Sequence, residues 1–174
     1  RVEVKASSDR QWLLENLLLN SDRSKKLKVA CIMDGFTFNS YRYECDLHQI
    51  SRDNWLLDLE RIQPEMLFVE SAWRGIDEQW YNLINKNVKE LQDIINWCRD
   101  RGIPTVFWNK EDPIHFQTFL NTAQQFDYVF TTDIDCVPKY REVLGHDNAY
   151  FLPFACQPVS NNPIELYERR EAFC

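Results

Sequence analysis

Short apolar runs alternate with amphipathic segments along most of this chain. The apolar runs are nearly continuous, which is typical of strands that are buried on both faces of a sheet. The segments between them repeat hydrophobic residues at the spacing of a helix. The pattern predicts strands at 27–34, 45–51, 66–71, 103–108, 126–130 and 149–152, and helices at 51–62, 88–98, 114–125 and 137–144. Residues 35–43, rich in aromatic and hydroxyl side chains, are predicted to form a loop.

The order of these elements predicts the fold class. Helical segments separate successive strands, and parallel strands need such crossover connections. We therefore expect an α/β domain at 27–157, a Rossmann-like open parallel sheet with helices on both faces.

Two further segments flank the predicted domain. Residues 1–26 place Trp12, Leu13 and Leu17 at helical spacing, which predicts an amphipathic helix. Residues 158–174 read as a proline-containing linker that leads into a second domain. We therefore expect the chain to be one domain of a longer protein.

Composition and charge exclude several classes of function. The 174 residues are 44% hydrophobic and 27% charged, which is typical of a globular chain and not of a disordered one. The net charge of −7 and the lack of a long basic cluster argue against nucleic acid as a partner. No apolar run approaches the roughly 18 residues that a membrane span needs.

The six cysteines bear on cellular location. They are widely spaced and include no Cys-x-x-Cys pair, and Cys31, Cys98 and Cys136 fall inside predicted strands or helices. Cysteines in such places behave as small buried hydrophobic residues. Since no signal-peptide pattern is present either, we expect reduced thiols in a cytoplasmic protein.

The four strongest predicted strands all end in polar or charged residues. Parallel strands bring their carboxyl ends to one edge of a sheet, and open α/β sheets bind their ligands at that edge. We therefore expect the functional site there. The strand-end groups are Asp34, Glu70 and Ser71, the four residues 109–112, and the three residues 131–133.

The loops that follow these strands lack the familiar cofactor motifs. The chain has no Gly-x-Gly-x-x-Gly, no P-loop, no His-Glu-x-x-His and no Gly-x-Ser-x-Gly. An ordinary dinucleotide site, a zinc site and a serine nucleophile are therefore not expected. Mg²⁺ bound by the strand-end acids Asp34, Glu70, Asp112 and Asp133, as in receiver domains, is an open alternative.

Aromatic rings beside carboxylates favour a carbohydrate ligand. Rings stack on sugar faces, while carboxylates hydrogen-bond to hydroxyls or act as a general base. For each ring a place in the core is the alternative; for Asp112 it is an acid at a helix N-terminus, and for Lys110 a solvated pair with Glu111. The candidate rings are Phe36, Phe38, Tyr41, Trp73, Trp80, Trp108, His115 and Phe116.

Three segments resemble the N-terminal half of the CgeB-like glycosyltransferases, a spore-maturation-type family. They are 69–75, 107–116 and 130–133, and the second, which contains Glu111-Asp112-Pro113, is the most specific. The order of elements agrees over roughly three quarters of the chain. The resemblance implies a GT-B architecture, in which two Rossmann-like domains face each other across a cleft. This chain would then be the acceptor-side domain.

The resemblance also implies partners and residue roles. A C-terminal domain would bind the nucleotide-sugar donor, a UDP-sugar, whereas this domain would need no cofactor or metal and would bind a glycan, polymer or lipid acceptor. Glu111 or Asp112 would be the catalytic base. A non-catalytic carbohydrate- or partner-binding module and a receiver- or flavodoxin-like signalling domain stay open as alternatives. The predicted acceptor-binding residues are Asp34, Phe36, Glu70, Ser71, Trp73, Arg74, Asn109, Lys110, His115, Thr132 and Asp133.

Overall fold

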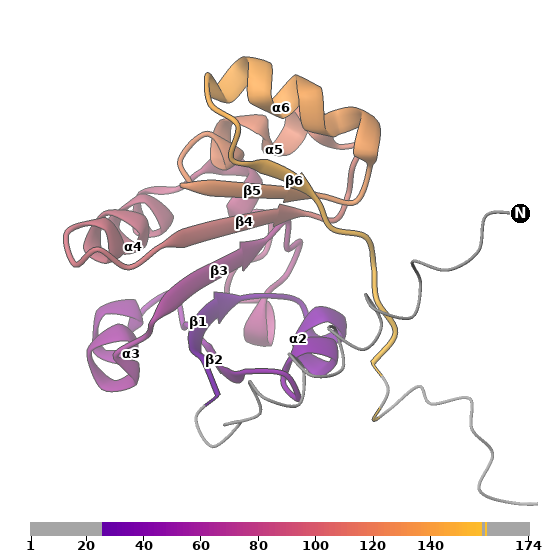
Figure 1. Ribbon diagram of the computed structural model, residues 1–174. Helices are drawn as coiled ribbons and strands as arrows, with labels where there is room; N and C mark the ends of the chain where they lie inside the picture. The colour runs from indigo at the N-terminus through magenta and orange to yellow at the C-terminus, as the bar shows by residue number, and fades with distance from the viewer. Residues whose placement is uncertain (1–25, 158, 160–174) are drawn as a thin grey trace, which may run out of the picture.

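The computed structural model describes residues 26–157 and 159, which contain one six-stranded sheet (Figure 1). The strand order is β2-β1-β3-β4-β5-β6, and every neighbouring pair is parallel. The predicted Rossmann-like α/β class is therefore confirmed. The strands are β1 (Lys28–Ile32), β2 (Asp46–Gln49), β3 (Met66–Glu70), β4 (Thr105–Asn109), β5 (Tyr128–Thr131) and β6 (Ala149–Phe151).

Helices connect the strands, as the alternation predicted. The four predicted helices all occur, although those expected at 51–62 and 114–125 are shorter and begin at Trp55 and Phe116. The predicted N-terminal helix and the predicted linker lie outside the described residues, apart from residues 26 and 159. The helices are α2 (Gly35–Tyr41), α3 (Trp55–Ile62), α4 (Lys89–Arg99), α5 (Phe116–Ala123) and α6 (Val137–Leu144), with 3₁₀ turns at Ile76–Glu78, Ile84–Lys86 and Ile134–Cys136.

The segment after β1 was predicted as a loop, but it forms helix α2. Its sequence, Gly-Phe-Thr-Phe-Asn-Ser-Tyr, is poor in strong helix formers. Packing outweighs this, because the Tyr41 ring contacts those of Phe68 and Trp108, with centroids 5.5 and 6.0 Å away. The first turn closes where the Phe38 N–H donates to the Asp34 carbonyl at 3.0 Å. The prediction was wrong because tertiary contacts, and not local propensity, stabilise this helix.

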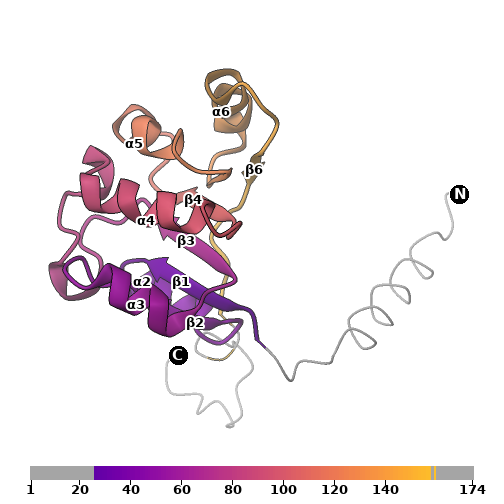
Figure 2. The ribbon, with the colours of Figure 1, turned by 90° about the vertical axis from the view of Figure 1, so that its left-hand side faces the viewer.

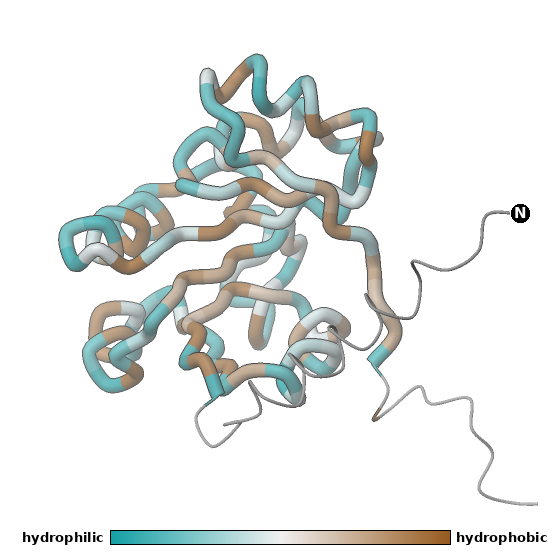
Figure 3. The backbone as a smooth tube through the Cα atoms, in the orientation of Figure 1, coloured by the Kyte–Doolittle hydropathy of each residue, from teal (hydrophilic) through white to brown (hydrophobic). Residues whose placement is uncertain are grey.

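Two hydrophobic cores fill the two faces of the sheet. On one face, residues from α3, α4, α5 and α6 pack on strand residues such as Val69 and Phe107. On the other face, α2 and the chain after β6 cover Cys31, Phe68 and Trp108. The central strands are therefore buried on both sides, and they appear as brown hydrophobic stretches inside the molecule in Figure 3. Helices α3 and α4 are neighbours in both ribbon views (Figures 1 and 2).

The strand order creates a topological switch point. The chain leaves β1 toward β2 on one side and leaves β3 toward β4 on the other. The connections therefore diverge at the carboxyl ends of β1 and β3, where open α/β sheets have their ligand crevice. Asp34 follows β1 and Glu70 ends β3, so these two predicted site residues belong to the switch point.

Four cysteines of the described residues, Cys31, Cys45, Cys98 and Cys136, are free thiols, and Cys31, Cys98 and Cys136 are buried as predicted. Burial raises the pKa of the Cys98 thiol to about 12. Burial likewise raises the pKa of Cys136 to about 11. Among the helices of residues 26–157, none has the length and apolarity to cross a membrane.

Alkaline pH should destabilise the fold through its buried thiols. An unfolded cysteine titrates near pH ~8.5, while the folded-state pKa of Cys98 is about 12, so the unfolded chain loses this proton first. The stability due to the neutral thiol is complete below about pH 8.5 and is lost as the pH rises toward the folded-state value. Urea unfolding should therefore show a stability difference between the wild type and Cys98→Ala that shrinks from pH ~7 to pH ~10.5. A difference independent of pH would contradict this prediction.

The loop after β3 is fixed by a close contact between Gly75 and Trp80. Trp80 is fully buried, and its indole N–H donates to the Ile50 carbonyl at 3.0 Å. Gly75 has a φ of +68°, and a Cβ atom there would lie 2.8 Å from Trp80 Cδ1. A side chain at Gly75 therefore meets both an unfavourable backbone conformation and a buried ring that has no room to move.

Gly75→Ala should lower the free energy of unfolding by about 2–4 kcal/mol, because backbone strain adds to overlap with Trp80. Gly102→Ala is the matched control: Gly102 has a φ of +66°, and a Cβ atom there would have no neighbour within 4 Å. The control should lose only the backbone contribution of about 1 kcal/mol. Urea unfolding of both variants measures the difference, and equal losses would show that the Trp80 contact is unimportant.

Candidate functional site

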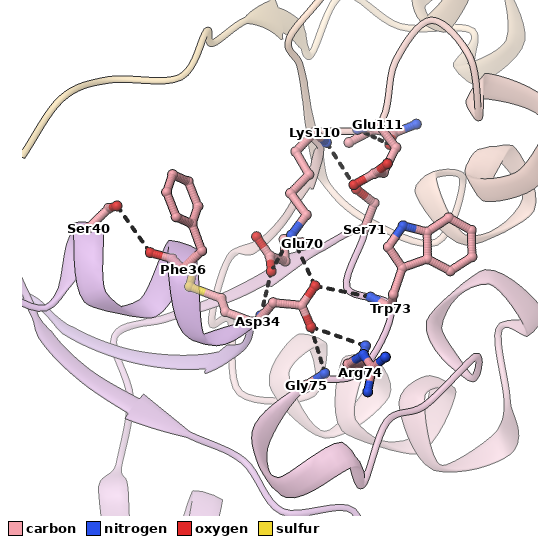
Figure 4. A network of polar contacts seen from close by, with 12 residues as sticks. Asp34, Phe36, Ser40, Glu70, Ser71, Trp73, Arg74, Gly75, Lys110 and Glu111 are labelled. Atoms are coloured by element: carbon pink, nitrogen blue, oxygen red, sulfur yellow. Dashed lines mark hydrogen bonds and ion pairs between the residues drawn. The ribbon is translucent and has the colours of Figure 1, made fainter.

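The Asp34 carboxylate lies at the centre of the switch point (Figure 4). Its Oδ1 accepts hydrogen bonds from the backbone N–H groups of Gly75 at 2.8 Å and Arg74 at 3.1 Å. Its Oδ2 accepts from the Trp73 N–H at 3.2 Å and from Lys110 Nζ at 3.0 Å. The loop after β3 thus wraps three successive backbone amides around one carboxylate, an arrangement that stabilises an anion.

Asp34, Glu70 and Lys110 form a cluster that we call the switch-point triad. Lys110 Nζ lies 3.1 Å from Glu70 Oε1, and the same oxygen accepts the backbone N–H of Asp34. The Glu70 side chain has no exposed surface, and that of Lys110 is only 10% exposed. The triad therefore joins the ends of β1, β3 and β4 by charged groups that are largely shielded from water.

Burial and pairing shift the pKa values of the triad in different directions. Burial raises the pKa of the Glu70 carboxyl, and the Lys110 charge offsets only part of this effect. Burial opposes ionisation of Asp34 as well, but the Gly75 N–H and Lys110 outweigh it and hold the pKa of Asp34 below its usual range. Burial disfavours the Lys110 ammonium, yet the charges of Glu70 and Asp34 prevail and raise its pKa. Lys110 is therefore protonated and forms ion pairs with the carboxylates of Asp34 and Glu70.

A second hydrogen-bond cluster lies at the ends of β4 and β5. Asp112 Oδ2 accepts from the Thr131 hydroxyl at 2.6 Å, and Oδ1 accepts from Asn109 Nδ2 at 2.7 Å and from the Tyr140 hydroxyl at 3.4 Å. Burial raises the pKa of the Asp112 carboxyl, and the two hydroxyls offset part of this effect. Since α5 begins only at Phe116, Asp112 is not an acid of that helix's first turn. It links β4, β5 and α6 instead.

Glu111 follows the end of β4, and its carboxylate has no hydrogen-bonding partner among the described residues. Its backbone N–H donates to Asn109 Oδ1 at 3.1 Å, which fixes the main chain at this point. Its carboxylate is partly exposed and makes no hydrogen bond or ion pair with the residues that the structure describes. Figure 4 shows Glu111 directly after Lys110, on the loop that the triad anchors. Glu111 is therefore available to a ligand.

Trp73 and His115 form an aromatic pair at the same edge of the sheet. Their rings meet edge to face with centroids 5.2 Å apart, and Trp73 meets Phe119 at the same distance. Both side chains are half-buried. Each ring is thus partly packed on the core and partly accessible to a ligand. Both alternatives considered for these rings from the sequence, a place in the core and a ligand contact, therefore apply in part.

Several other predicted site residues support the main chain of the edge. The Ser71 hydroxyl accepts the Lys110 backbone N–H at 3.0 Å, and the Thr132 hydroxyl donates to the Lys110 carbonyl at 3.3 Å. The Asp133 carboxylate caps the following 3₁₀ turn by accepting the Asp135 N–H at 2.9 Å. Asn109 has no exposed surface and belongs to the second cluster. These residues hold the loops in place.

Phe36 and Arg74 lie at the surface. The Arg74 guanidinium is exposed and pairs with Glu78 four residues later. The Phe36 side chain is 70% exposed and faces Phe154, with ring centroids 6.3 Å apart. Phe36 therefore borders a cavity beside α2, and that cavity does not include Glu111.

Sequence reasoning missed several residues of these clusters. Thr131 belongs to the polar strand end 131–133, but only Thr132 and Asp133 of that segment were predicted as site residues. Tyr140 comes from α6, and no sequence spacing connects it with Asp112. In the part of the chain that the structure describes, no three His, Cys, Asp or Glu side chains are grouped so as to hold a metal ion.

Comparison with known proteins identifies no relative of this chain. Models of protein families, curated proteins and solved structures were all compared with the chain, and none of the three comparisons gave a match.

Loss of the Lys110 charge should strongly destabilise the protein. Lys110→Met leaves two carboxylates without their cation, one of them fully buried, and should cost about 3–5 kcal/mol in urea unfolding. Lys89→Met is the control, because it breaks an exposed ion pair with Asp93 and should cost less than about 0.5 kcal/mol. Adding Glu70→Gln to Lys110→Met should restore part of the stability by removing the buried charge. If Lys110→Met lost no more than the control, the triad would not stabilise the fold.

Proposed function

We propose that this chain is the acceptor-side domain of a GT-B-type glycosyltransferase, which transfers a sugar from a nucleotide-sugar to a hydroxyl of a glycan, polymer or lipid. The observation that supports this most is the Glu111 carboxylate, which is unpaired among the described residues, partly exposed and placed at the carboxyl edge of the sheet. A general base needs a free carboxylate on a rigid support. The Rossmann-like sheet is the fold that this class of enzyme requires of each of its halves.

The proposal gives different roles to the two acids that the sequence could not separate. Glu111 is the base in this proposal. Asp112 has both oxygens engaged by protein donors, so it is a positioning residue that fixes the loop beneath Glu111. Trp73 and His115 offer partly open rings for stacking on a sugar, and the exposed Arg74 suits a phosphate on the acceptor.

The proposed reaction is a displacement at the anomeric carbon of the donor. The acceptor hydroxyl gives its proton to the Glu111 carboxylate while its oxygen bonds to that carbon. The bond from the carbon to the diphosphate breaks, and the nucleoside diphosphate leaves with the electron pair. The donor, a UDP-sugar in this proposal, is bound by a separate C-terminal domain, and the reaction takes place in the cytoplasm.

Glu111→Gln should abolish most of the transfer activity without loss of stability. In the longest natural chain that contains these residues, the rate of sugar transfer should fall by about 10²–10⁴-fold, the usual contribution of a general base. The melting temperature should be unchanged, since the carboxylate makes no hydrogen bond or ion pair within the described chain. Glu142→Gln on the exposed face of α6 is the matched control and should keep full activity.

Two results would contradict the proposed function. Full turnover by Glu111→Gln would place the base elsewhere. Glycan binding by the wild type, with no transfer from any nucleotide-sugar of a broad panel, would favour the non-catalytic carbohydrate-binding module.

A further inference from the structure

The loop that follows β3 holds several residues in the left-handed region of backbone conformation. Asp77, Glu78 and Asn82 have φ angles of +48°, +59° and +50°, which residues with a side chain rarely adopt. Gly75 precedes them with a φ of +68°. A backbone conformation of this kind costs free energy and persists only where the surrounding contacts impose it. The loop therefore depends on groups outside its own sequence.

Two hydrogen bonds close the loop on itself. The Asn82 N–H donates to the Trp73 carbonyl, and the Trp80 N–H donates to the Arg74 carbonyl, each at 2.9 Å. The carbonyls of residues 73 and 74 are thus used within the loop, whereas the N–H groups of residues 73, 74 and 75 donate away from it, to Asp34. Successive amides that donate toward one point form a concave site for an anion.

The anion in this site is the Asp34 carboxylate (Figure 4). Its Oδ1 accepts the N–H groups of Arg74 and Gly75, and its Oδ2 accepts the Trp73 N–H and Lys110 Nζ. These four donors come from the loops after β3 and β4, whereas the carboxylate comes from the end of β1. The Asp34 side chain is 21% exposed, so the site is open to small solutes in the solvent.

Asp58 provides a comparison with a carboxylate that supports a helix. Its Oδ2 accepts the N–H and the hydroxyl of Ser51 at 2.9 and 2.6 Å, and its Oδ1 pairs with Arg61. The Arg61 side chain is 76% exposed, so water can hydrate it when Asp58 is removed. Removal of Asp34 instead leaves three convergent amides and the Lys110 ammonium, which is only 10% exposed. Only the Asp34 position therefore has the donor set of an anion site.

We propose that the loop after β3 and Lys110 form an oxyanion-binding site, and that Asp34 is its built-in ligand. The loop needs an anion at this point to keep its shape, but the anion need not be attached to the chain. A free carboxylate as small as formate therefore binds there once the Asp34 carboxylate is removed. In the native protein Asp34 fills the site, so the switch point does not accept a nucleotide phosphate as other open α/β sheets do.

Thermal unfolding of Asp34→Ala in the 174-residue chain tests the proposal. Asp34 has φ −72° and ψ 156°, which alanine adopts without strain, so the variant loses only the carboxylate. Sodium formate at about 100 mM should raise its melting temperature by about 3 °C or more relative to sodium chloride, because an anion that binds only the folded state stabilises it. The wild type should not respond to formate or to inorganic phosphate. A response of Asp34→Ala no larger than that of the wild type would overturn the proposal.

Two further variants separate a specific site from a general salt effect. Asp58→Ala also loses a hydrogen-bonded carboxylate, but formate should stabilise it no more than chloride does. Asp34→Asn keeps the space filled and an oxygen on the amides, so formate should have no effect there either. An equal response of Asp58→Ala would overturn the proposal.

The test stays decisive if Asp34→Ala does not fold in chloride. Addition of formate in the cold should then restore the helical circular dichroism of the wild type, because binding and folding are linked. A chain that stays unfolded in about 1 M formate would overturn the proposal. The outcome does not depend on the proposed sugar transfer, because each of these measurements reports on folding alone.

Discussion

The Asp34 carboxylate is the group on which the carboxyl edge of this sheet depends. Three backbone amides of the loop after β3 and the Lys110 ammonium all converge on it. Backbone amides and a cation at a switch point are the groups with which many open α/β sheets bind a ligand anion. Here a side chain of the protein itself takes that position. The loop after β3 and the start of the loop after β4 are consequently joined to the end of β1 through this one carboxylate.

This arrangement separates residues that support the edge from residues that can react. Asp34, Asp112 and Asn109 direct their polar atoms to other protein groups. A carboxylate held by several donors is a weak ligand for anything else, because a ligand would have to replace bonds that already exist. Glu111 is held in position by these neighbours, while its carboxylate oxygens make no hydrogen bond or ion pair with a described residue. The chemistry proposed for this protein therefore rests on a reactive group that inert groups hold in place.

Glu70 connects the switch point with the cavity beside α2. One of its oxygens belongs to the triad, and the Thr37 hydroxyl of α2 interacts with the same carboxyl group and lowers its pKa, against the larger effect of burial. Helix α2 begins directly after Asp34, so the element that lines the cavity starts at the central carboxylate.

The sequence by itself determined the α/β class, the strands and the edge at which the polar residues gather. It did so because strands buried on both faces require continuous apolar runs, and parallel strands require helical crossovers. It did not reveal α2, whose residues are poor helix formers and whose stability comes from Phe68 and Trp108. Nor did it distinguish Glu111 from Asp112, which are adjacent carboxylates in the chain. Only the tertiary structure decided which acids are occupied, because their partners lie far away in sequence; Lys110 is 76 residues from Asp34.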